Sequence, residues 1–234
     1  MINARNELIF IYLNLKAFIN FKIKSFFSSI IYGHFIRNNA IKKYFHNKNK
    51  KIKIHLGANK DIKNFLNSQI LGKIPINITK KLPFKNRTVD VIFSTHVVEH
   101  IHRKELDFFI SESFRVLKKD GLNIICTPSL KKIIEIVYLN NNEKKDLLFK
   151  RQDKWYQDDI KTACHQINMT MRNFGHRFLV DDEYMSWLSK KNQFSGCDVV
   201  SIDNIPDEDI KKYILEDKDK VWDAESDIYV LKKN

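Results

Sequence analysis

Two histidines and a carboxylate lie close together in residues 96–100, which read HVVEH. Taken alone, the spacing of His96, Glu99 and His100 matches the helix of a zinc peptidase, which presents two histidines one turn apart as metal ligands. Such a site needs a third ligand and a helix on both sides of the motif. Here the motif follows the β-branched run at residues 89–94 almost directly, so the sequence predicts no metal. His100 then has two interpretations, a catalytic base or a hydrogen-bonded wall residue.

A further histidine lies in the sequence Gly175-His176-Arg177. A guanidinium binds carboxylates and phosphates through paired hydrogen bonds, and an imidazole titrates near neutral pH. The pair His176 and Arg177 therefore suits an anionic or hydroxyl-rich substrate, with His176 as a candidate base. The alternative is that the two side chains only cap the segment in which they lie.

The elements that must position these residues follow from periodicity. Residues 89–94 predict a strand, and residues 103–117 predict a helix. The apolar side chains at helical spacing are Leu106, Phe109, Ile110, Phe114 and Leu117. We expect Gly121 to end this helix in the left-handed conformation, before a second strand at residues 122–127. A strand, a crossover helix and another strand form a parallel unit of an open α/β sheet.

The order of short motifs through residues 82–128 resembles the second half of class I S-adenosylmethionine-dependent methyltransferases. It is most similar to the branch associated with surface-polysaccharide biosynthesis. The motifs are Leu82-Pro83-Phe84, Val89-Asp90-Val91-Ile92, His96-Val97-Val98-Glu99-His100, Arg115-Val116-Leu117-Lys118-Lys119-Asp120-Gly121 and Thr127-Pro128. Five motifs in this order over about fifty residues are far more specific than any one of them. The resemblance covers residues 52–130 well and residues 168–200 loosely.

The resemblance implies a fold and a division of the chain. We expect an α/β fold, a doubly wound Rossmann-like methyltransferase sheet that is mostly parallel with an antiparallel closing strand. The methyltransferase-like domain would span residues 51–234, with a helical insert at residues 131–180 that covers the acceptor. Residues 1–50 would form a basic, amphipathic helical extension. A length of 234 residues with 43% hydrophobic composition is sufficient for one such domain.

The resemblance also implies S-adenosylmethionine as the cofactor. The loop after the first strand must let backbone approach the ligand, a need that Gly57 meets because it has no side chain. Gln69 stands where the family commonly has an acid that binds the ribose hydroxyls. Its amide oxygen accepts hydrogen bonds without charge assistance. The expected cofactor contacts are Gly57, Asn59, Gln69, Asn77, Ser94 and His96, which requires Gly57 and Ser94 to lie side by side.

The implied reaction is methyl transfer to an oxygen or nitrogen of a small-molecule or glycan acceptor. Such an in-line displacement mainly requires alignment, with at most one base for the acceptor proton. His100 and His176 are the candidate catalytic residues. Asn59 replaces a second glycine and Gln69 replaces an acid, so the alternative is a catalytically degenerate scaffold protein in a glycan-assembly complex.

The net charge of +13 belongs mainly to the N-terminal arm. Residues 1–60 contain 12 lysines and arginines and one acid, whereas the remaining chain is nearly neutral. This distribution argues against a nucleic-acid partner. Residues 8–45 predict an amphipathic helix whose lysines exclude a membrane span. The helix either covers the domain or contacts an anionic membrane surface peripherally. We expect a cytoplasmic protein, with membrane contact, if made, at the inner face.

Three cysteines, Cys126, Cys164 and Cys197, are scattered along the chain without a paired metal spacing. Their odd number and wide separation give no disulfide framework and fit a reducing compartment. Because Cys126 falls within a predicted strand, we interpret it as a small buried hydrophobic residue.

Overall fold

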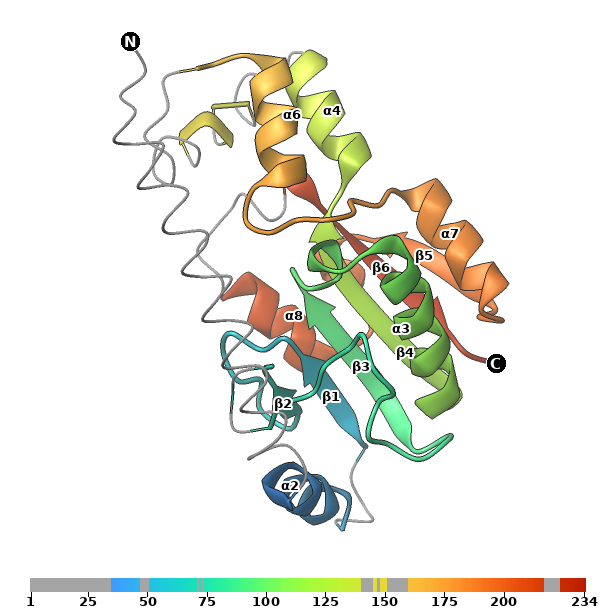
Figure 1. Cartoon of the computed structure of the whole chain (residues 1–234). Helices are drawn as coiled ribbons and strands as arrows, with labels where there is room; N and C mark the ends of the chain where they lie inside the picture. Colours follow the sequence, from blue (N-terminus) through green and yellow to red (C-terminus); the bar gives the residue numbers. More distant parts are fainter. Residues whose placement is uncertain are drawn as a thin grey trace.

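A computed structural model describes residues 35–46, 51–70, 72, 74–139, 145–146, 148–150, 160–216 and 224–234. Within them six strands form one sheet in the order β2-β1-β3-β4-β6-β5 (Figure 1). The strands are β1 (Lys53–Leu56), β2 (Leu66–Ser68), β3 (Val89–Thr95), β4 (Leu117–Pro128), β5 (Gly196–Val200) and β6 (Ser226–Lys232). β6 is antiparallel to both β4 and β5, and the pairs among β1 to β4 are parallel. The predicted sheet, mostly parallel with an antiparallel closing strand, is confirmed.

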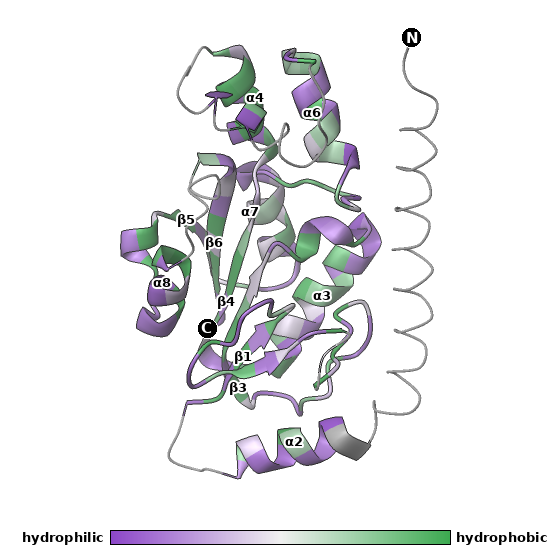
Figure 2. Cartoon of the chain, turned by 90° about the vertical axis from the view of Figure 1, so that its left-hand side faces the viewer, coloured by the Kyte–Doolittle hydropathy of each residue, from purple (hydrophilic) through white to green (hydrophobic). Residues whose placement is uncertain are grey.

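Helices cover both faces of the sheet. They are α2 (Phe35–Phe45), α3 (Arg103–Val116), α4 (Leu130–Tyr138), α6 (Ala163–Arg172), α7 (Asp182–Lys191) and α8 (Glu208–Leu215), with short 3-10 turns η2 (Val98–His100) and η3 (Ile202–Asn204). α3 and α8 lie on opposite faces, as Figure 2 shows with the sheet between them. α4 and α6 form a pair beyond the carboxyl ends of the strands, and α2 lies at their amino ends (Figure 1).

The alternation of side chains along β3 explains the two layers. Ile92 belongs to the core beneath α3 and α7, whereas Val91 and Phe93 belong to the core beneath α8. Successive side chains of a strand point to opposite faces, so a strand buried on both faces carries apolar residues in succession, as β3 does at residues 91–93. The core residues of α3 are Leu106, Phe109 and Ile110, and those of α8 are Ile210 and Ile214.

The passage from α3 to β4 differs from the sequence prediction. Asp120, not Gly121, adopts the left-handed conformation, with φ 59°. α3 ends in an extended residue, Leu117, which already begins β4. The register of β4 against β3 shifts between the pairs at Val89 and Val91, so the turn at residues 118–121 is an irregularity within the strand. Gly121 is needed for space, since a Cβ there would lie 2.9 Å from the Lys118 carbonyl oxygen.

α4, α6 and α7 lie between β4 and β5 along the chain. Asp181 caps α7, with its side chain accepting from the Tyr184 N–H at 2.8 Å. α4 ends at Tyr138, and residues 140–144 lie outside the described part of the chain. Of the predicted arm helix, α2 is described and residues 8–34 are not. Among the described helices, none combines the length and apolar character required to span a bilayer.

Candidate functional site

The turn after β1 and the tip of β3 are neighbours. Leu56, the last residue of β1, pairs in parallel register with Ser94 of β3, and Gly57 follows directly. The carboxyl ends of parallel strands share one edge of a sheet, which is where ligands bind in open α/β folds. The adjacency that the sequence required of Gly57 and Ser94 is therefore present.

Gly57 is constrained in two ways. Its φ of +75° lies in the left-handed region, which residues other than glycine rarely adopt. A Cβ at Gly57 would also lie 2.2 Å from Cγ2 of Val97. Val97 thus occupies the space above the glycine, and a ligand that approaches the Gly57 backbone requires Val97 to change its position.

Two buried hydroxyls flank the end of β1. Leu56 pairs with Ser68 on one side and with Ser94 on the other. Both serines are fully buried, and neither Oγ has a hydrogen-bond partner within the described structure. Unpartnered buried hydroxyls are costly, so polar groups of a ligand would stabilise them. This edge therefore fits a ligand with hydroxyl or amino groups. Ser68 was not predicted, although it directly precedes Gln69.

The other expected cofactor contacts differ in their exposure and in whether their side chains already make hydrogen bonds. Asn59 and Gln69 are exposed beyond the ends of β1 and β2. Asn77 is half-buried, and its Oδ1 accepts from the N–H and from the hydroxyl of Thr79, both at 2.9 Å. A contact of this oxygen with an adenine amine would compete with both bonds.

His55, at the end of β1, is a buried histidine with a structural role. Burial lowers the pKa of His55 to about 4, despite a contact of its Nδ1 with Asn67 Oδ1 at 3.2 Å. The ring stacks on Phe93 with centroids 5.0 Å apart. His55 is therefore neutral at pH 7 and is held within the core beneath α8.

A polar cluster centred on Glu99 lies past the tips of β3 and β4. Glu99 is fully buried, and its Oε2 accepts from the Thr127 hydroxyl at 3.0 Å. Its Oε1 lies 3.1 Å from His96 Nδ1 and 4.0 Å from His100 Nε2. Oε1 is therefore within ion-pair distance of His96 and at the limit of that distance from His100. The sequence suggested Glu99 only as part of a motif, not as the centre of the cluster.

The HVVEH motif does not form one helical face. His96 follows β3 in the left-handed region, with φ 49°, and its N–H donates to the Cys126 carbonyl at 2.9 Å. Glu99 and His100 lie in the 3-10 turn η2. The peptidase geometry considered for His96 and His100 is therefore not formed.

The electrostatics of the cluster favour an anionic Glu99. Burial acts to raise the pKa of Glu99, but the nearby imidazoles of His96 and His100 outweigh burial and hold that pKa below its ordinary value. The carboxylate is thus charged at neutral pH inside an otherwise closed environment. Positive charge placed next to it will be stabilised strongly.

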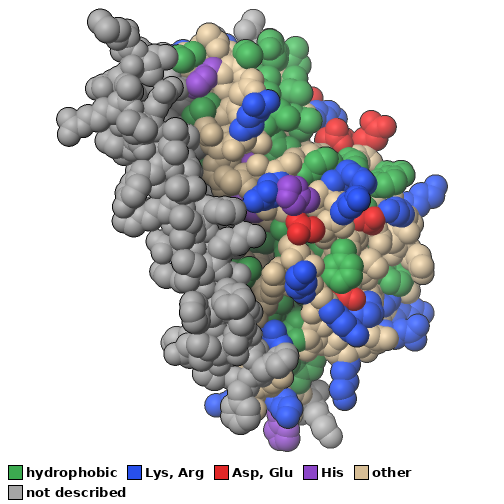
Figure 3. Space-filling model, in the orientation of Figure 1, with side chains coloured by type: hydrophobic (Ala, Val, Ile, Leu, Met, Phe, Trp, Pro, Cys, Tyr) green, Lys and Arg blue, Asp and Glu red, His purple; other side chains and the backbone are tan. Residues whose placement is uncertain are grey.

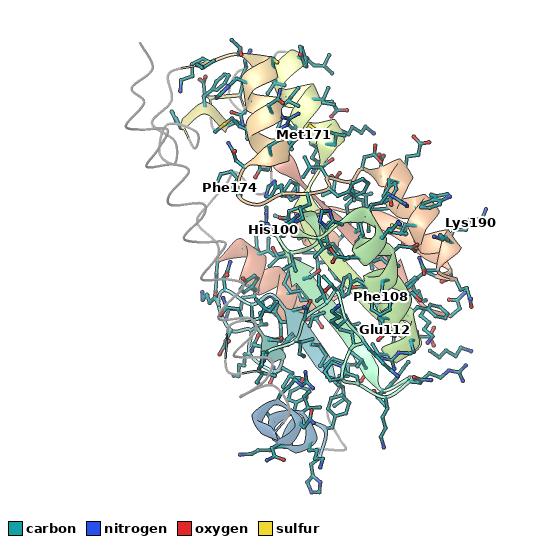
Figure 4. The ribbon with its side chains drawn as sticks, viewed as in Figure 1. His100, Phe108, Glu112, Met171, Phe174 and Lys190 are labelled. Atoms are coloured by element: carbon teal, nitrogen blue, oxygen red, sulfur yellow. The ribbon has the colours of Figure 1, made fainter. Side chains whose placement is uncertain are left out.

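The segment between α6 and α7 brings His176 to this cluster. The backbone N–H groups of Arg177 and Phe178 donate to the Glu99 carbonyl at 2.7 and 3.3 Å. The rings of His100 and His176 meet edge to face with centroids 5.0 Å apart. Figure 4 shows His100 beside Phe174, which lies in the same segment, between the sheet and α6.

His176 is held in one orientation. Its Nδ1 lies 2.6 Å from the Thr170 carbonyl, which can only accept, so Nδ1 carries the proton and Nε2 a lone pair. Burial lowers the pKa of His176, and the attraction of Glu99 does not reverse this. Arg177, which the sequence paired with His176, is exposed and contacts His102 Nε2 at 2.9 Å instead. His176, and not Arg177, therefore joins the cluster.

The central part of the chain is similar to a known protein family. Residues 54–125 match a family model described as a methyltransferase domain. A search of curated protein sequences gives no significant match. The matched residues contain β2, β3 and all of β1 except Lys53, together with Gly57, Ser94 and the residues His96 to His100, whereas His176 lies outside them.

Solved structures of low identity resemble the chain. An Archaeoglobus fulgidus SAM-dependent methyltransferase is 13% identical, with TM-score 0.45, over 84% of this chain and 91% of that chain. A SAM-dependent methyltransferase of Thermotoga maritima is 12% identical, with TM-score 0.44, over 94% and 96%. A Haemonchus contortus phosphoethanolamine N-methyltransferase 2 is 13% identical, with TM-score 0.42, and this chain spans 56% of its length. We assign the Rossmann-like methyltransferase fold to this chain from the strand order and directions given above.

Proposed function

We propose that this chain is an S-adenosylmethionine-dependent methyltransferase that acts on an oxygen or nitrogen of a small-molecule or glycan acceptor. The match of residues 54–125 to a methyltransferase domain carries the proposal, because that segment contains the adjacent Gly57 turn and Ser94 tip. The glycan class depends on the sequence motifs that resemble the polysaccharide-associated branch. On the face shown in Figure 3, basic side chains are spread among acidic and apolar ones, which suits a small acceptor better than a nucleic acid.

The donor side of the site would be the edge at β1 and β2. S-adenosylmethionine supplies a methyl group on a positively charged sulfur. The residues that would hold it are Gly57, Asn59, Gln69, Asn77, Ser94 and His96. Movement of Val97 would open the Gly57 backbone to the methionine part, and the buried hydroxyls of Ser68 and Ser94 would gain polar partners. The protein's task is then to align donor and acceptor and to exclude water.

The acceptor side would be the cluster under the α6–α7 segment. Nε2 of neutral His176 carries a lone pair and can take the acceptor proton. Buried Glu99 would stabilise the imidazolium that results. His100, which is half-exposed beside His176, is the second candidate base.

Calorimetric titration of the full chain with S-adenosylhomocysteine tests the proposal. We expect binding by the natural chain and about fivefold tighter binding by Gln69→Asp, because a carboxylate accepts charge-assisted hydrogen bonds from the ribose hydroxyls. Gln69→Ala is the matched control and should not tighten binding. Gln69 is exposed, so neither substitution endangers the fold.

The rival function is a catalytically degenerate scaffold, which the position of Val97 above Gly57 favours. Absence of heat at millimolar S-adenosylhomocysteine, for both the natural chain and Gln69→Asp, would reject the enzyme and support the scaffold.

A further inference from the structure

We propose that Glu99, His100 and His176 form a binding site for one divalent transition-metal ion, with Zn²⁺ as the representative ligand. Each residue offers one ligand atom, and the three atoms lie within 4.8 Å of one another. Metal bonds to histidine nitrogen and carboxylate oxygen are about 2.0–2.2 Å long, so the ligand atoms of a tetrahedral ion lie about 3.4 Å apart. Side-chain movements of about one to two ångströms would therefore close the site.

The carboxylate of Glu99 offers a buried negative charge to a cation. The residue is completely buried, and Thr127 fixes one of its oxygens. The other oxygen, Oε1, lies 3.1 Å from His96 Nδ1 and 4.0 Å from His100 Nε2. A buried carboxylate is costly unless a cation or a donor stands beside it. A metal ion bound between Oε1, His100 and His176 would place a full positive charge against this oxygen.

His176 is oriented as metal-bound histidines are. Ligating histidines almost always donate their other ring N–H to a carbonyl or a carboxylate, which fixes the tautomer. The Nδ1 of His176 makes this bond to the Thr170 carbonyl. The backbone bonds from Arg177 and Phe178 to the Glu99 carbonyl hold the segment in place. The proposed site thus combines Glu99 and His100 of the HVVEH motif with His176 from a distant part of the chain.

Two imidazoles and one carboxylate form a donor set suited to Zn²⁺ and to other first-row divalent ions. Three protein ligands leave a coordination position open, as in catalytic sites. The side chain of His100 is 38% exposed, so the open position would face the acceptor region. If the proposed methyl transfer holds, on which this role depends, the ion would bind the acceptor oxygen and lower its pKa. His100 and His176 would then be metal ligands and not the bases described above. The acceptor proton would pass to water.

Titration of the chelator-treated full chain with Co²⁺ and Zn²⁺ tests the site. We expect one Co²⁺ per chain with visible bands of nitrogen and oxygen ligation, displaced by Zn²⁺. His176→Ala and Glu99→Gln should each weaken binding by about 100-fold or more. His46→Ala, at an exposed histidine of the described region, is the matched control and should bind as the natural chain does.

The outcomes separate the two proposals. Weak binding of several ions, or binding that His176→Ala and Glu99→Gln leave unchanged, would overturn the metal site. His100→Gln, at a half-exposed position, provides a third variant if the buried substitutions lower the melting temperature. S-adenosylhomocysteine titrations on the same samples keep the proposals apart, because binding of the metal without binding of the cofactor product would reject methyl transfer alone.

Discussion

The two halves of the sheet's carboxyl edge are built in different ways. At β1 and β2 the close contact is steric, between Val97 and Gly57, and the polar candidates Asn59 and Gln69 are exposed. At β3 and β4 the contacts are polar and buried, centred on Glu99. The first half must change its side-chain packing to admit a ligand. The second half already holds its polar groups in fixed orientations.

Under the proposed function, this difference separates the requirements for donor and acceptor. A bulky cofactor held mainly by backbone needs space, which one side chain can open or close. A reacting group needs charge at a defined place, and the protein provides it before any ligand arrives. The predictions that follow test each half in turn.

The largest expected effect is at Gly57. Gly57→Ala should lower the free energy of unfolding by about 3 kcal/mol. The alanine would have to adopt a left-handed backbone conformation, and its Cβ would clash with Val97. Urea denaturation followed by circular dichroism measures this. Gly196→Ala is the matched control, since nothing lies within 4 Å of its added Cβ.

A double substitution isolates the steric part of the Gly57 effect. Val97→Ala should recover about 1–2 kcal/mol in the Gly57→Ala background, relative to its effect in the natural chain. Strict additivity of the two substitutions would show that Val97 does not close this half of the edge.

His55 should make the β1 half sensitive to acid. The unfolded chain protonates His55 below about pH 6.5, whereas burial delays protonation in the folded protein to a pKa of about 4. Stability from this residue is therefore lost as the pH falls through that window, by about 2 kcal/mol between pH 7 and pH 5.

Urea titrations at pH 7 and pH 5 test this prediction. His55→Gln should reduce the stability difference between the two pH values, and His46→Gln, at an exposed position, should not. Equal acid sensitivity of His55→Gln and the natural chain would contradict a neutral, buried His55.

The smallest expected effect is at Thr127. Thr127→Val removes the hydroxyl that donates to Glu99 Oε2 and leaves a buried carboxylate oxygen without that donor. We expect the free energy of unfolding to fall by about 1.5 kcal/mol. Thr88→Val is the control and should cost less, because the Thr88 hydroxyl bonds the Lys85 carbonyl in an exposed setting. Equal costs would mean that the polar half is not fixed as described.

Periodic patterns in the sequence predicted the elements well. The alternation of β3 and the helical spacing of Leu106, Phe109 and Ile110 identified the strand, the crossover helix and the parallel unit. The prediction of which residue between α3 and β4 is left-handed was wrong by one position. Glycine is usually the residue that adopts this conformation, but Asp120 does so here while Gly121 makes room for the Lys118 carbonyl.

The arrangement of the site was less predictable. Adjacent strand ends follow from topology, so the adjacency of Gly57 and Ser94 could be inferred. The proximity of His176 to Glu99 joins a residue inside the predicted insert to one before it, and no local pattern indicates it. Likewise, the position of Val97 above Gly57 depends on how one side chain packs.

The bonds from the Arg177 and Phe178 amides to the Glu99 carbonyl involve main-chain atoms alone. Substitution of the side chains at positions 99, 100 and 176 therefore leaves both bonds chemically available to hold the segment in place. Under the proposed function, these three positions form a compact library for directed evolution of acceptor preference.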